Sequence, residues 1–235
     1  MEAAFDFEGS VVLVTGASGA LGSAVASAFD ASGATVCGAD VVAPGEDDAL
    51  VDPATVEFHQ TDATDEASVR DTVEAVVSEH GRLDAVCNIA GTWRGGDPIH
   101  ETDVDQFDML FDVNLKSMFL TSKHAIPHLR ETGGAVVSVS ARSSLEGGEG
   151  DGPYRASKAG VRLLTETIAE ENLGTVRANA IMPSVIDTPM NREMMPDADH
   201  DEWVDPAEIA DVVTFLCSDA AEVTSGAAIP VYGEA

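Results

Sequence analysis

Basic residues are scarce in this chain of 235 residues. It carries 12 lysines and arginines against 42 aspartates and glutamates, a formal net charge of −30, and only three of its cations are lysines. Such a charge repels nucleic acid and anionic membrane surfaces at ordinary salt. The composition therefore excludes nucleic-acid and membrane-surface binding, and we expect a small-molecule partner.

The carboxylates are spread along the whole chain rather than gathered in a tail. Their mutual repulsion destabilises a folded chain unless dense counterions screen it over a few ångströms. This pattern predicts adaptation to molar salt, as in the cytoplasm of an extreme halophile. An acidic protein from an ordinary cell is the alternative.

Cysteine is rare as well: Cys37, Cys87 and Cys217 are far apart in the chain, each within an apolar stretch. Their number and spacing predict small buried hydrophobes rather than disulfides or metal ligands. The six histidines show no ligand spacing, so we expect no metal.

Long apolar runs are missing too, which excludes a membrane-spanning helix. The first eight residues are acidic and lack the basic start of a signal peptide. We therefore expect a cytoplasmic protein.

Apolar, often β-branched runs alternate with segments of helical spacing. Strands are expected at 10–14, 34–39, 56–60, 83–89, 135–139, 176–182 and 227–232, and helices at 21–32, 66–79, 104–129, 154–170 and 206–217. This alternation predicts an α/β fold with a Rossmann-like, doubly wound, mostly parallel seven-stranded sheet and helices on both faces. No repeat or long linker is present, so we expect one domain over 1–235, with a small lid at about 188–205.

A glycine-rich turn, TGASGALG at 15–22, follows the first strand and opens the first helix. Its first glycine permits a tight turn, and the other two let the backbone approach a ligand closely. The helix N-terminus offers free N–H groups and a positive dipole to a pyrophosphate. Strand, glycines and helix in this order predict a dinucleotide site. The residues expected there are Gly16, Ser18, Gly19, Ala20 and Leu21.

Asp40 ends the second expected strand. A carboxylate at that point accepts hydrogen bonds from the adenosine ribose and repels a 2′-phosphate. No arginine follows it closely in the chain, so NAD(H) is favoured over NADP(H). A capping or loop carboxylate is the alternative interpretation.

Tyr154 and Lys158 are four residues apart on an expected helix and so share one face. A nearby ammonium stabilises phenolate and lowers the pKa of a tyrosine, which makes it a general acid or base. The spacing is common, however, and a surface helix with an aromatic anchor would show it too.

The motifs of the chain occur in one order, and it resembles that of the short-chain dehydrogenases/reductases from about Gly9 to Gly233. They are the glycine turn, Asp62 in TDAT, NIAG at 88–91, Asn114 in DVNLK, the pair Tyr154/Lys158, and PSVIDT at 183–188. The resemblance implies hydride transfer between a nicotinamide and a small carbonyl or alcohol.

The resemblance also implies individual roles. Tyr154 would exchange the proton, Lys158 would bind the nicotinamide ribose, and Asn114 would kink its helix and hold a relay water. The remaining cofactor contacts would come from Asp62, Ala63, Asn88, Ala90, Gly91, Pro183, Ile186 and Thr188. Packing is the alternative role for each, above all for Asn88.

One departure from the family pattern concerns the substrate oxygen. The family usually places a serine about thirteen residues before the tyrosine, and Ala141 occupies that register here. Ser140 or Ser143 could substitute if the loop shifts by a residue. Loss of the hydroxyl removes an oxyanion-type contribution of about 2–4 kcal/mol.

The departures resemble dihydropteridine reductases, which also manage without the serine. The similar segments are GALGS in the glycine turn, CNIAGTWRGG at 87–96, and 187–199 followed by Trp203. The resemblance implies a pocket for a flat substrate, whereas Asn114 is typical of ordinary carbonyl and alcohol enzymes. The expected pocket residues are Trp93, Ala141, Met190, Met194 and Met195. Alternatively, Trp93 and Trp203 only close a loop.

The leading hypothesis is thus an NAD(H)-dependent oxidoreductase acting on a carbonyl, alcohol or dihydropterin-like substrate. The alternatives are a 3-oxoacyl thioester reductase-like activity, a non-catalytic NAD(H)-binding sensor, and an epimerase or dehydratase suggested by the glycine spacing. By the resemblance, the helices at 104–129 and 154–170 would join subunits in a homodimer or homotetramer.

Overall fold

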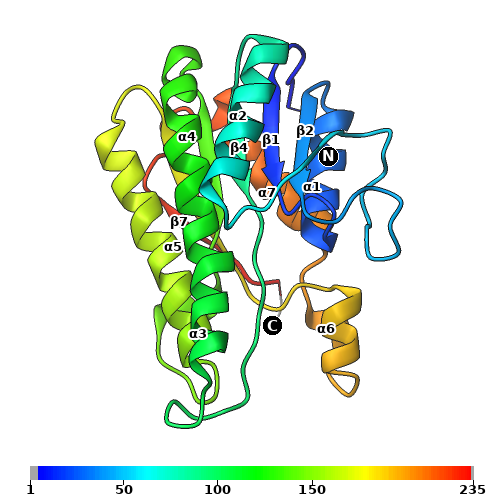
Figure 1. Cartoon of the computed structure of the whole chain (residues 1–235), viewed down its shortest axis with the longest axis vertical. Coiled ribbons are helices and arrows are strands. Elements are labelled where there is room, and N and C mark those ends of the chain that lie inside the picture. The colour runs from blue at the N-terminus through cyan, green and yellow to red at the C-terminus, as the bar shows by residue number, and fades with distance from the viewer. Residues whose placement is uncertain (1–4, 234–235) are drawn as a thin grey trace.

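The computed structural model describes residues 5–233 (Figure 1). Residues 1–4 and 234–235, on which the one-domain and signal-peptide predictions partly rest, lie outside the described residues. The strands are β1 (Val11–Thr15), β2 (Thr35–Asp40), β3 (Glu57–Gln60), β4 (Ala85–Asn88), β5 (Ala135–Val139), β6 (Arg177–Pro183) and β7 (Ala228–Val231). The helices are α1 (Ala20–Ala31), α2 (Glu66–His80), α3 (Val104–Phe111), α4 (Ser117–Thr132), α5 (Gly152–Glu171), α6 (Pro189–Met194) and α7 (Pro206–Cys217).

The strands form one seven-stranded sheet in the order β3-β2-β1-β4-β5-β6-β7. Every pair of neighbours is parallel, so the expectation of a mostly parallel sheet understated the regularity. The reason is that each strand returns to the same edge through a crossover segment, and α7 provides this crossover even for the last strand. Strand ends that carry polar residues therefore meet at one edge of the sheet.

Both faces of the sheet are buried, because successive side chains of a strand point to opposite faces. Val12 and Val14 of β1 pack into a core with α1 and α7, whereas Val11 and Leu13 pack into a second core with α2, α4 and α5. Figure 1 shows the green α4 and yellow-green α5 side by side, with α1 and α7 on the other side of the sheet. The predicted helices on both faces are confirmed.

The helix expected over 104–129 is interrupted. A π-helical turn, Asp112–Lys116, separates α3 from α4. Such a turn carries one extra residue per turn and usually marks a functional position. Asn114 lies inside it and is buried, so the kink that the family resemblance implied at this residue is present.

The stretch expected to form the lid, at about 188–205, contains the short helix α6. Thr188 caps it, accepting a hydrogen bond from the Asn191 N–H at 3.1 Å, and Pro189 occupies its first position. This helix is only six residues long and buries none of them. It therefore lacks the apolar spacing from which the other helices were predicted. Figure 1 shows α6 standing apart from the helices that pack on the sheet.

The three cysteines are free thiols. Cys37 and Cys87 are buried, as expected, and Cys217 is half-buried. Although Cys87 and Cys217 are far apart in the chain, their side chains share a hydrogen bond. This hydrogen bond and burial together raise the pKa of Cys87. Within residues 5–233, no helix has the length and apolarity needed to cross a membrane.

Candidate active site

The glycine turn is tight at two of its three glycines. Gly16 has φ of 69°, and a Cβ there would lie 2.8 Å from the Ala90 backbone, while a Cβ at Gly22 would lie 1.9 Å from the Gly16 carbonyl oxygen. Gly19 meets only that oxygen, at 3.5 Å, and it begins α1 without a side-chain cap. The first amides of α1 therefore have no side-chain cap and are available to an anion such as a pyrophosphate.

Asp40 lies directly beside this turn. Its two carboxylate oxygens accept hydrogen bonds from the backbone N–H groups of Ser18, at 3.0 Å, and Val42, at 3.1 Å. The Ser18 hydroxyl also donates to the Val42 carbonyl at 2.6 Å. The turn and the end of β2 are thereby joined, and a negative charge is held where an adenosine ribose would lie. The residues present fit a dinucleotide.

Asp62 follows the third strand at the same edge. Its Oδ1 accepts hydrogen bonds from the Thr64 hydroxyl at 2.7 Å and the Thr64 N–H at 2.8 Å, which together hold the pKa of the carboxyl below its usual range. Ala63 lies in the same turn. The Asp62 carboxylate shapes this turn, and the backbone N–H of Asp62 donates to the Ser68 hydroxyl at 3.0 Å.

Asn88 lies in the core rather than at the site surface. Its Nδ2 donates to the Ser138 hydroxyl at 3.1 Å and the Ser122 hydroxyl at 3.3 Å, which ties β4 to β5 and α4. These contacts of the side-chain nitrogen are of the packing kind named as the alternative, whereas the Asn88 Oδ1 is buried without a hydrogen-bond partner within residues 5–233. The loop after it approaches the centre through its backbone, because a Cβ on Gly91 would lie 2.9 Å from the Lys158 Nζ.

Asn114 and Lys158 converge around this glycine, and Tyr154 precedes Lys158 by one turn of α5. The Asn114 Oδ1 accepts from the Thr92 N–H at 2.7 Å, and its Nδ2 donates to the Thr92 carbonyl at 3.0 Å. The Lys158 Nζ donates to the Val139 carbonyl at 2.9 Å. The end of β5, the start of α5 and the π-helical turn are thus brought together.

The electrostatics differ from the sequence prediction for the pair Tyr154/Lys158. Burial raises the pKa of Tyr154 to about 12, the charge of Asp151 adds to this, and Arg155 opposes it. Burial lowers the pKa of Lys158 to about 8. The direction is therefore opposite to the predicted one, because burial dominates the pKa of Tyr154 and Lys158 is not among the charges that act on it.

The serine register is occupied as the sequence indicates. Ala141 directly precedes the short helical turn Arg142–Leu145 and is 6% exposed. The Ser140 hydroxyl donates to the Lys158 carbonyl at 2.8 Å and is buried, so it faces α5. Ser143 is half-buried, and its hydroxyl makes no hydrogen bond within residues 5–233, which leaves it the freer of the two hydroxyls.

The segment after β6 is held in place by its own backbone. Pro183 ends the strand, Ile186 pairs with Val204, and the Ile186 carbonyl accepts from the Asn191 side chain at 2.8 Å. Thr188 then caps α6. Pro183, Ile186 and Thr188, all expected as cofactor contacts, therefore lie along one short path from the sheet edge to α6.

The expected pocket residues are distributed around this edge. Met190, Met194 and Met195 lie on or next to α6 and are 62%, 44% and 38% exposed. Trp93 is 44% exposed, and a Cβ at Gly95 would lie 3.0 Å from its ring. Trp93 thus packs against its own loop at Gly95, while the methionines form an open apolar surface on and next to α6.

Ser157 was not singled out from the sequence. Its hydroxyl donates to the Tyr154 carbonyl at 2.7 Å and accepts from the Asn114 Nδ2 at 3.1 Å. It therefore joins the π-helical turn to the first turn of α5. Its place three residues after the tyrosine and next to Lys158 was the available signal.

Comparison with known proteins decides the family. The sequence model of a family described as enoyl-(acyl carrier protein) reductase matches residues 16–233. A 3-oxoacyl-[acyl-carrier-protein] reductase of Thermotoga maritima is 32% identical over 96% of this chain and 97% of its own length. The chain belongs to the short-chain dehydrogenase/reductase family.

Other short-chain dehydrogenases/reductases agree with this assignment. The meso-2,3-butanediol dehydrogenase of Serratia marcescens is 33% identical over 97% of this chain and 95% of its own length. The solved structure of the aldohexose dehydrogenase of Thermoplasma acidophilum superposes with a TM-score of 0.88, at 27% identity, over 98% of this chain and 95% of that one. The protein is accordingly an oxidoreductase of a family that uses nicotinamide cofactors.

Proposed function

We propose that this short-chain dehydrogenase/reductase is an NAD(H)-dependent enzyme that reduces a small carbonyl or dihydropterin-like substrate, or oxidises the corresponding product. The observation that supports this most strongly is the buried chain of hydrogen bonds from Asn114 through the Ser157 hydroxyl to the Tyr154 carbonyl, next to the buried Lys158. A protein that only binds a nucleotide has no use for such a network.

The chemistry divides between cofactor and protein. The bound nicotinamide supplies or accepts the hydride. In the reducing direction Tyr154 gives its phenolic proton to the substrate atom that gains electron density, and Lys158 places a positive charge beside the phenolate that remains. Asn114 holds the loop at Thr92 against α5, which fixes the distance between that loop and the lysine.

The test is NADH oxidation with a panel of carbonyls and pterins in molar salt, with Tyr154→Phe as the comparison. We expect the variant to lose about 10²–10⁴-fold in kcat, the usual contribution of a positioned general acid. Tyr154→Phe with full activity would overturn the assignment of the acid. Tight NADH binding with no turnover on any substrate would favour the non-catalytic sensor instead.

Asp40 supports NAD(H) over NADP(H). The carboxylate is held by two backbone amides and cannot swing away easily to admit a 2′-phosphate. Asp40→Ser keeps a hydrogen-bonding group and removes the charge. We expect kcat/KM for NADPH to rise and that for NADH to fall, whereas equal or better use of NADPH by the unaltered enzyme would contradict the preference.

Ala141 and the methionines of α6 are the features that support the proposed substrate class. With no hydroxyl in the serine register, the substrate depends mainly on Tyr154, which suits a substrate whose electron sink is an extended ring. The exposed methionines of α6 are apolar and adaptable, as a flat ligand requires. A 3-oxoacyl thioester reductase activity is the second candidate, favoured by the similarity to the Thermotoga maritima enzyme. Comparing kcat/KM for a quinonoid dihydropterin and a 3-oxoacyl thioester distinguishes them.

Self-association through α3, α4 and α5 completes the proposal. Phe107, Phe119 and Leu163 on these helices are 42%, 48% and 54% exposed, an apolar surface that a second copy would cover. We propose a homodimer or homotetramer in the cytoplasm of a cell with high internal salt. Light scattering as a function of salt tests both points, because a monomer at every salt concentration would contradict self-association.

A further inference from the structure

A cysteine, a histidine and a glutamate from three separate elements meet far from the glycine turn. Ligand atoms of Cys37 on β2, Glu57 on β3 and His80 at the end of α2 all lie within 4.8 Å of one another. Ligand atoms of a tetrahedral zinc site lie about 3.3–3.8 Å apart, so side-chain rotation of the two partly exposed residues suffices to close the gap. Nothing in the proposed reaction uses this group.

The fold itself produces this convergence. Cys37 and Glu57 are directly paired across the parallel ladder of β2 and β3, so their side chains leave the same face of the sheet. Cys37 packs in the core beside Val73 and Val76 of α2, and His80 lies one turn beyond Val76 on the same helix face. The sequence concealed the cluster because its members are separated along the chain by about twenty residues each.

The polar atoms of the cluster lack the hydrogen bonds that buried groups usually make. The Nε2 of His80 is 3.0 Å from a Glu57 carboxylate oxygen but outside hydrogen-bond geometry, and it has no other partner within the described residues. The Nε2 of His59, two residues along β3 from Glu57, is also buried without a partner there. Unpaired imidazole nitrogens are the atoms with which histidine binds metals.

Charge and access also suit a divalent cation. Glu57 and Glu79 both lie close enough to Cys37 to act on it electrostatically, so negative charge surrounds the position that a cation would occupy. A thiolate, a carboxylate and a neutral imidazole neutralise a 2+ ion and leave a fourth position for water. The Glu57 side chain is 50% exposed and that of His80 15%, so an ion can enter from solvent.

The composition makes the group distinctive. The chain has 42 carboxylates, yet within residues 5–233 this is the only set of three or more cysteine, histidine or acidic ligands that lie so close together. Repulsion spreads the acidic residues apart, and the group that does form combines sulfur, nitrogen and oxygen. That donor set suits Zn²⁺ and Co²⁺ rather than Mg²⁺ or Ca²⁺.

We propose that Cys37, Glu57 and His80 form a binding site for a zinc-class divalent cation, which joins the edge strand β3 to β2 and α2. The proposal goes beyond the sequence prediction of Cys37 as a small buried hydrophobe, whose burial the structure confirms. Asp40 ends β2 three residues beyond Cys37, about 10 Å along the strand. The ion would therefore stabilise the strand that presents Asp40 without touching a cofactor.

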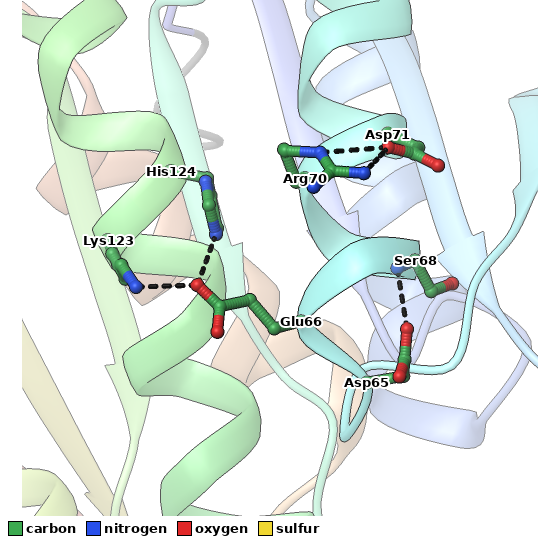
Figure 2. Close-up of polar contacts among 7 residues, drawn as sticks. All are labelled: Asp65, Glu66, Ser68, Arg70, Asp71, Lys123 and His124. Carbon is green, nitrogen blue, oxygen red and sulfur yellow. Dashed lines mark hydrogen bonds and ion pairs between the residues drawn. The ribbon is translucent and has the colours of Figure 1, made fainter.

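The chain supplies a matched control in the pair Glu66 and His124. Their side chains are 53% and 19% exposed, and the His124 Nε2 lies 3.4 Å from the Glu66 carboxylate, much as in the pair Glu57/His80. Figure 2 shows the difference: Lys123 and His124 both point to the Glu66 carboxylate. The Lys123 Nζ lies 2.5 Å from the Glu66 Oε1, and among the described residues no cysteine groups with this pair as a third close ligand. The ammonium takes the position that a metal ion would need.

The experiment is a titration of chelator-treated protein with Co²⁺, and separately with Zn²⁺, in molar KCl to screen loose binding to carboxylates. We expect a thiolate-to-cobalt charge-transfer band that saturates at a single equivalent, and a melting temperature that rises with Zn²⁺ concentration. Cys37→Ser should abolish the band. His80→Gln and Glu57→Gln should weaken the apparent Kd about 10- to 100-fold or more.

His124→Gln should bind like the unaltered protein. Because Cys37 is fully buried, Cys37→Ser could misfold. His80→Gln and Glu57→Gln change partly exposed residues, and once circular dichroism shows that they are folded, their Co²⁺ affinities test the site. Absence of the band in the unaltered protein overturns the proposal, as does Co²⁺ binding by His80→Gln and Glu57→Gln that is as tight as that of His124→Gln.

Discussion

The side-chain amide of Asn114 donates to the Ser157 hydroxyl at 3.1 Å, and that hydroxyl donates in turn to the Tyr154 carbonyl at 2.7 Å. One serine therefore joins the π-helical turn to the first turn of α5. Both Asn114 and Ser157 are buried, so no solvent competes for these hydrogen bonds. The relative position of Asn114 and the tyrosine depends on this contact.

Ser157→Ala should reduce kcat about tenfold while leaving the KM for NADH nearly unchanged. The loss of one buried hydrogen bond should also lower the free energy of unfolding by about 1 kcal/mol. Thr167→Ala, which removes a hydroxyl bonded to the Leu163 carbonyl on the exposed side of α5, is the control. Steady-state kinetics and denaturant melts measure both effects, and a Ser157→Ala enzyme with unaltered kcat would contradict the role.

Carbonyl reduction should slow as the pH rises through about 8. Lys158, whose pKa burial lowers to about 8, is charged below that pH and neutral above it. Tyr154, with a pKa of about 12, keeps its proton throughout this range. The pH profile of kcat measures the effect, and the charge on Lys158 is irrelevant to the rate if the profile is flat on both sides of 8.

Lys158→Met should stabilise the fold while it abolishes activity. The folded chain binds fewer protons than the unfolded chain between pH 8 and 10.5, because the pKa is lowered on folding, so the free energy of unfolding rises with pH in that window. Below pH 8 the folded chain bears the full cost of the buried charge, of the order of 3 kcal/mol. Denaturant melts at neutral pH test this. A variant less stable than the unaltered protein would mean that the hydrogen bond to Val139 outweighs desolvation.

Ala141→Ser should restore a hydroxyl to the family's usual register. Since Ala141 is nearly buried beside the start of the Arg142–Leu145 turn, the added oxygen should aid a small carbonyl substrate by up to the 10²–10³-fold of an oxyanion donor. A pterin substrate should gain little. The ratio of kcat/KM values for the two substrates, measured against Ser143→Ala, shows whether Ser143 already supplies this hydrogen bond.

Local pattern accounts for most of the fold. The seven strands and five long helices lie within a few residues of their predicted positions, because runs of buried apolar residues and helical spacing reflect the same burial that the sheet imposes. The π-helical turn and α6 could not be predicted as elements. The first differs from an α-helix by one residue, and the second buries no side chain.

The sequence by itself determined the doubly wound fold, the glycine turn, the order of the motifs and the alanine in the serine register. Each depends on residues close together in the chain. Only the tertiary structure decided that the Asn88 amide bonds to Ser138 in the core, that Ser157 links Asn114 to Tyr154, and that Cys37 meets Glu57 and His80. It also reversed the expected direction of the Tyr154 pKa. The physical reason is that hydrogen bonding and desolvation depend on burial and on contacts between segments that are distant in the chain, which the spacing of neighbouring residues does not predict.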